Sequence, residues 1–145
     1  MNGTYEERVC WKGYRSFTFT VNRDSWSIRF YFPGPDARYN GSSLSINQEE
    51  IDDYITSYRK NWEEYQLLKN NIPEGGSFRK EISIKEGIWK KMSINVGSSG
   101  IYADGVCIDY LHLPINDEEE LNSLLEQFEY CKSKAPKIME WLSKN

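Results

Sequence analysis

Apolar and polar side chains alternate along the first part of the chain, from Arg8 to Phe32. This period of two is typical of β-strands with one buried face, because successive side chains point to opposite sides of a strand. A break at Gly13 and a turn at 22–24 divide the stretch into three runs, which predict three antiparallel strands in a meander. The apolar members are Val9, Trp11, Phe17, Phe19, Val21, Trp26, Ile28, Phe30 and Phe32.

Helical spacing replaces the alternation after a segment rich in turn-forming residues, Pro33 to Ser43. Asn47 and Glu50 have the spacing of a capping box, in which each end of the pair satisfies a free backbone N–H at a helix start. Apolar and aromatic side chains then recur every three or four positions, which predicts a helix that ends before Pro73. They are Ile51, Tyr54, Ile55, Tyr58, Trp62, Tyr65 and Leu68.

The second half of the chain repeats this order of patterns. Alternation returns at 78–84 and 92–96, and an apolar stretch from Ile101 to Leu113 predicts a sixth strand. A second helix is predicted to begin at Asn116. Proline lacks the N–H that a helix interior uses, so Pro136 is predicted to break this helix and leave a short C-terminal helix after it.

Together the patterns predict an α+β fold: a two-layer antiparallel sheet of about six strands with two main helices on one face. Leu44 to Glu50 also parallels Leu113 to Glu119, with Asn at the cap and Glu three positions later in both. We interpret the parallel as a βββα duplication inside a single domain, 1–145, with pseudo-repeat halves 1–72 and 73–145. Convergence on common helix-start signals is the alternative explanation.

Charge narrows the classes of partner. The formal net charge is −4, from 18 basic and 22 acidic residues that are interleaved along the chain. Nucleic-acid binding usually needs a basic stripe, so this distribution argues against it. No apolar run approaches the roughly 20 residues of a membrane span or forms a signal peptide, which predicts cytoplasmic residence and no membrane partner.

Candidate chemistry is sparse. The three cysteines have no CxxC spacing and His112 is the only histidine, so neither a metal nor another cofactor is predicted. An enzyme using His112 or Cys107 is the weakest hypothesis, because strand alternation places these two side chains on opposite faces.

Two surfaces remain as binding candidates. The predicted polar face of the sheet carries aromatic and basic residues of the kinds enriched at binding hot spots, beside a long loop. The competing interpretation is an ordinary solvated sheet face. The residues predicted to bind a partner are Arg29, Tyr31, Asp36, Arg38, Tyr39, Trp89 and Lys91.

The tyrosine-rich stripe of the first helix suggests a second hypothesis. Hydroxyl groups along a buried helix face are consistent either with plain core packing or with a ligand cleft at the junction of the pseudo-repeats. A small-molecule ligand there would contact Tyr54, Tyr58, Tyr110 and His112.

The sequence thus favours a non-enzymatic protein-binding inhibitor or adaptor, with a small-molecule-binding domain as the alternative. In general type the chain resembles small bacterial or phage proteins that bind and block a larger protein, such as immunity or anti-defence proteins. That resemblance covers no specific motif and assigns no residue a role. Homo-oligomerisation is left open.

Overall fold

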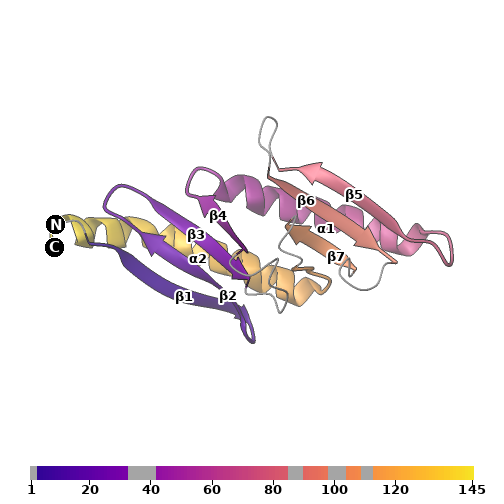
Figure 1. Ribbon diagram of the computed structural model, residues 1–145, viewed down its shortest axis with the longest axis horizontal. Helices are drawn as coiled ribbons and strands as arrows, with labels where there is room; N and C mark the ends of the chain where they lie inside the picture. The colour runs from indigo at the N-terminus through magenta and orange to yellow at the C-terminus, as the bar shows by residue number, and fades with distance from the viewer. Residues whose placement is uncertain (1–2, 33–41, 85–89, 98–103, 109–112) are drawn as a thin grey trace. The chain divides into compact units, whose positions relative to one another are not determined.

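The part of the chain that the structure describes has an α+β fold with two antiparallel sheets and two helices (Figure 1). The computed structural model describes residues 3–32, 42–84, 90–97, 104–108 and 113–145. It consists of two compact units. The first unit combines Met1–Ile51 with Asn122–Asn145, and the second unit is Asp52–Leu121.

The sheet of the first unit is a four-stranded antiparallel meander in the order β1-β2-β3-β4. Its first three strands, β1 (Tyr5–Lys12), β2 (Arg15–Val21) and β3 (Trp26–Phe32), lie where alternation predicts them. The fourth, β4 (Ser42–Asn47), was predicted as the approach to a helix cap and is instead paired along β3, with Leu44 opposite Phe30. Its own alternation supports the strand, because Leu44 and Ile46 are buried while Ser43 and Ser45 are not.

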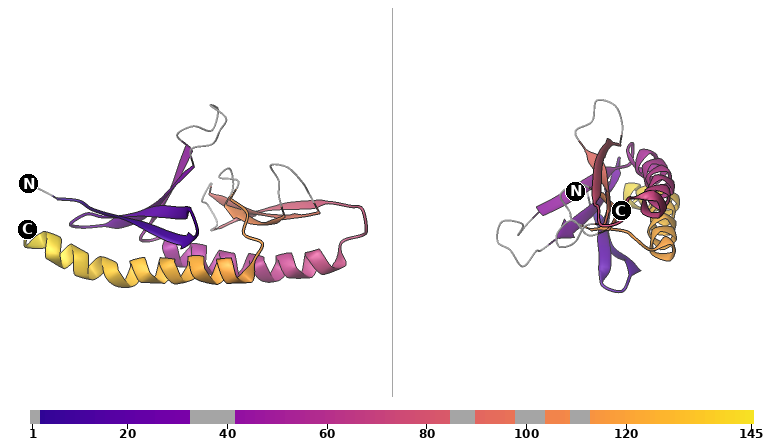
Figure 2. Two further views of the ribbon diagram at one scale, coloured as in Figure 1. Left: turned by 90° about the horizontal axis from the view of Figure 1, so that it is seen from below. Right: turned by 90° about the vertical axis from the view of Figure 1, so that its right-hand side faces the viewer.

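Helix α2 (Glu118–Ser143) covers one face of this sheet from Asn122 onward (Figure 2). The Phe128 ring lies 5.7 Å from that of Phe17 and 6.2 Å from that of Phe30, between centroids. Burying a phenylalanine side chain contributes about 1.5–3 kcal/mol, so this aromatic cluster is a large part of the first unit's stability. The buried sheet residues are Val9, Trp11, Phe17, Phe19, Val21, Trp26, Ile28, Phe30, Leu44 and Ile46.

In the second unit, α1 (Ile51–Asn71) packs on a three-stranded sheet in the order β5-β6-β7. The strands are β5 (Phe78–Ser83), β6 (Lys91–Val96) and β7 (Gly105–Ile108). The Asn61 side chain reaches the Met92 sulfur at 3.6 Å, and Glu64 pairs with Lys80 at 2.7 Å. The predicted helical stripe faces inward, because Tyr54, Tyr58 and Tyr65 are each 1% exposed.

This arrangement differs from the prediction of one sheet with about six strands and two helices. The described residues form seven strands in two sheets, and each unit has its own helix. Alternation shows which side of a strand is apolar but not which strands share a sheet. Most of the predicted sixth strand, 101–103 and 109–112, lies outside the described residues, and the duplication remains a prediction.

The two predicted helix caps are shifted. Glu50 accepts a hydrogen bond from the Asn47 backbone N–H at 3.0 Å, as in a capping box, yet α1 begins only at Ile51 because Asn47 ends β4. At α2, Asp117 takes the capping role predicted for Asn116, since its carboxylate accepts from the Glu119 N–H at 3.0 Å. Both residues are suited to a cap, so spacing alone could not separate them.

The prediction that Pro136 ends a helix is wrong, because α2 continues through it to Ser143. Pro136 is exposed, while Cys131, Ala135, Ile138 and Leu142 are buried at helical spacing on either side of it. Burial of this stripe offsets the hydrogen bond that the proline cannot make.

Replacing Pro136 by alanine should therefore raise the free energy of unfolding. Alanine restores the missing N–H and has the highest helix propensity, and the exposed proline ring contributes little to the core. We expect a gain of about 1–3 kcal/mol in urea unfolding. No change or a loss would show that the ring itself stabilises the turn.

Candidate interaction surface

The face of the first sheet that α2 does not cover is polar and accessible. We call it the outer face. None of its side chains is buried, and serine and threonine make up half of them. Its members are Glu6, Arg8, Cys10, Ser16, Thr18, Thr20, Ser27, Arg29, Tyr31, Ser43, Ser45 and Asn47.

Strand register places two arginines in one row across this face. Arg8 pairs with Thr18, Thr18 with Arg29, and Arg29 with Ser45. The Nε–H of Arg8 donates to Ser16 Oγ at 3.1 Å, and that of Arg29 lies 3.5 Å from Ser45 Oγ, a long contact. Serine hydroxyls on neighbouring strands therefore orient both guanidinium groups.

Two of the predicted partner-binding residues, Arg29 and Tyr31, lie on the outer face. Arg29 is exposed, and Tyr31 is 53% exposed, an unusually large accessible surface for a tyrosine in a strand. Arg8 completes the row although sequence analysis did not select it. The signal was present, since Arg8 alternates with the buried Val9 in the same way that Arg29 alternates with Ile28 and Phe30.

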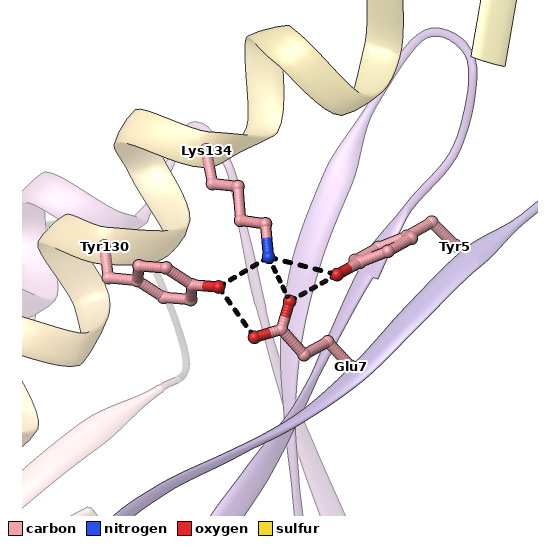
Figure 3. A network of polar contacts seen from close by, with 4 residues as sticks. All are labelled: Tyr5, Glu7, Tyr130 and Lys134. Atoms are coloured by element: carbon pink, nitrogen blue, oxygen red, sulfur yellow. Dashed lines mark hydrogen bonds and ion pairs between the residues drawn. The ribbon is translucent and has the colours of Figure 1, made fainter. Parts of the chain in front are cut away.

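On the inner side of β1, a closed polar network joins the strand to α2 (Figure 3). The Lys134 ammonium donates to Glu7 Oε1 at 2.7 Å and to the hydroxyls of Tyr130 at 2.6 Å and Tyr5 at 3.2 Å. Both tyrosines in turn donate to Glu7, Tyr130 to Oε2 at 2.7 Å and Tyr5 to Oε1. All three ammonium protons and both carboxylate oxygens are used, so the network is suited to anchoring rather than to catalysis.

The network stabilises the charged forms of both ionic members. Burial acts to raise the pKa of Glu7, but hydrogen bonds from Lys134, Tyr5 and Tyr130 outweigh it and hold that pKa below its ordinary value. Hydrogen bonds to Glu7 and the two tyrosines raise the pKa of Lys134. The pair therefore remains ionised across the neutral range.

Exchanging Glu7 for glutamine should weaken the anchor of β1. Both side chains remain partly exposed, 26% for Glu7 and 34% for Lys134, so solvent screening limits the loss to about 1–2 kcal/mol. Because folding lowers the pKa of Glu7, its contribution is fully present above the ordinary value of 4.5 and is lost as pH falls through the folded-state pKa. The difference between wild type and Glu7→Gln should thus shrink in acid.

A double-mutant cycle with Lys134→Met provides the control, since methionine keeps the apolar stem without the charge. We expect a coupling energy of about 1 kcal/mol at neutral pH, measured by urea unfolding. Strictly additive effects would contradict a direct interaction between the two groups.

Of the other predicted partner-binding residues, Lys91 alone lies among the described residues. Lys91 lies in the second unit, where its ammonium is 3.7 Å from Glu81. Asp36, Arg38, Tyr39 and Trp89 lie outside the described residues.

The polar face predicted for the second half is partly closed. Alternation with the apolar Met92, Ile94 and Val96 predicts that Ser93 and Asn95 face solvent, but each is 2% exposed. The Asn95 amide donates to Ser93 Oγ at 3.3 Å and lies 3.9 Å from the Cys107 sulfur. Strand β6 is therefore buried on both sides, which alternation of small polar with apolar residues cannot reveal.

The residues of the small-molecule hypothesis are only partly described. Tyr54 and Tyr58 lie in the core of the second unit, and burial raises the pKa of Tyr58 well above its ordinary value. Cys107 is also buried, at 6% exposure. Tyr110 and His112 lie outside the described residues, so neither this hypothesis nor the enzymatic one is tested.

In the described part of the chain, His, Cys, Asp and Glu side chains form no group of three or more that could hold a metal ion. Neither of its helices has both the length and the apolar character needed to cross a membrane.

Comparison with known proteins gives no relative. No protein-family model matches the chain, and neither the curated proteins nor the solved structures contain a match.

Proposed function

We propose that the chain is a non-enzymatic protein-binding module, an inhibitor or adaptor, and that the outer face of the first sheet is its contact surface. The observation that carries the proposal is the exposure of Arg29 and Tyr31 side by side along β3. Arginine and tyrosine are two of the residue types that contribute most to protein interfaces.

The outer face lies on a sheet whose other side is packed in the core, and this rigidity favours protein binding. The residues of the outer face belong to strands whose opposite side chains pack in the core. Arg29, for example, lies between the buried Ile28 and Phe30. A surface that is already ordered loses less conformational entropy on binding. The surrounding serine and threonine hydroxyls can donate or accept hydrogen bonds, as the rim of an interface requires.

The test is capture of a partner by the full chain from the cells in which it occurs, followed by affinity measurement on the purified complex. Arg29→Ala combined with Tyr31→Ala should weaken the complex at least tenfold, about 1.4 kcal/mol, because two hot-spot side chains are removed.

The matched control combines Tyr14→Ala with Arg23→Ala. It removes the same residue types from the strand turns, where Tyr14 is 96% exposed and Arg23 is exposed, and should leave the affinity unchanged. A double variant of Arg29 and Tyr31 that binds as tightly as wild type would exclude the outer face as the contact surface.

A further inference from the structure

Arg8 and Arg29 have no acidic partner among the described residues, whereas several other cations do. Lys80, Arg79 and Lys134 pair with Glu64, Glu81 and Glu7 at 2.7, 3.2 and 2.7 Å. No ion pair in the described part of the chain involves Arg8 or Arg29, whose bonds are to serine hydroxyls.

The geometry of the row suits paired carboxylates. Arg8 and Arg29 flank Thr18, so their backbones are two strand spacings apart, roughly 10 Å. The serine contacts involve each Nε–H, which leaves the terminal nitrogens of the guanidinium as a fork. Such a fork matches the two oxygens of a carboxylate.

We propose that the outer face binds an acidic protein segment, with Arg8 and Arg29 each taking one carboxylate. This inference rests on the proposed protein-binding function and adds the chemistry of the partner. In a polyproline-II segment, side chains three positions apart lie on the same side and are separated by about 9 Å, because that helix has three residues per turn and a rise of about 3.1 Å per residue. A segment of this conformation with acids at that spacing fits the row.

A protein segment is favoured over nucleic acid by the charge of the face. Nucleic-acid affinity comes from many phosphate contacts along a basic track. Here the described outer face has two arginines and one carboxylate, Glu6, and a single aromatic side chain, Tyr31, on which a base could stack.

The test is an NMR titration of the isotope-labelled full chain at low salt with a blocked hexapeptide that carries two glutamates three positions apart. Saturable shifts are expected at the amides of Thr18, Arg29 and Ser45. The same peptide with glutamines in place of glutamates should produce none. Salt of about 0.5 M should abolish the effect, because exposed charges are then screened within a few ångströms.

Variants identify the groups responsible. Arg8→Gln combined with Arg29→Gln should weaken binding at least tenfold, whereas Arg79→Gln, a cation already paired with Glu81, should not. Changing Arg8 and Arg29 to lysine keeps the charge without the fork and should weaken binding severalfold. Unshifted resonances in the core will confirm that each variant is folded.

Three results would overturn the inference: shifts confined to other surfaces, equal binding by the double glutamine variant, or tighter binding of an oligothymidine strand to the same row. The peptide experiment needs no native partner, so the two proposals can fail separately. A native complex that depends on Arg29 and Tyr31 without peptide binding would reject only the acidic partner. Peptide binding without any native complex would reject the proposed function.

Discussion

The packing of α2 on one side of the first sheet is the constraint on which the proposed interaction surface depends. Phe128 contacts Phe17 and Phe30, and the helix adds a buried stripe along its length. Because side chains alternate across a strand, burying one set commits the other set to the opposite side. A register slip of one residue in β3 would put Arg29 into the core, so the hydrophobic packing also fixes the outer face.

Strand β1 shows how the two faces use charge differently. Glu7, on the inner side, is enclosed by Lys134 and two tyrosine hydroxyls, and every ionic group in that network has a partner. Among the described residues, Arg8, one position along the same strand, bonds only to a serine hydroxyl. The network holds the strand and leaves none of its ionic groups unpaired, whereas the arginine row is the part that we propose for binding. Polar groups that hold the fold and polar groups that are proposed to bind thus alternate along a single strand.

Alternation and helical spacing located β1 to β3, β5, β6 and the buried side of both helices, because these signals are local. The same alternation predicted that Arg29 and Tyr31 lie on the polar face of the sheet, and it could have identified Arg8 as well. Contacts between residues far apart in the sequence could not be predicted from these local patterns. Nothing near Glu7 in the sequence indicates Lys134, 127 positions away, and the stripe that carries α2 past Pro136 stabilises a helix only once a sheet covers it. The burial of Asn95 likewise depends on distant packing.

The division of the first unit into a covered and an open side can be measured with its own cysteines. Cys10 is exposed on the outer face, whereas Cys131 lies buried on α2, where burial raises its pKa to about 12. Alkylation of the native protein, resolved by peptide mass, should modify Cys10 at the rate of an ordinary thiol and Cys131 at least about a hundredfold more slowly, which corresponds to an opening free energy of about 2.7 kcal/mol. Comparable rates at both thiols, or a protected Cys10, would contradict the account.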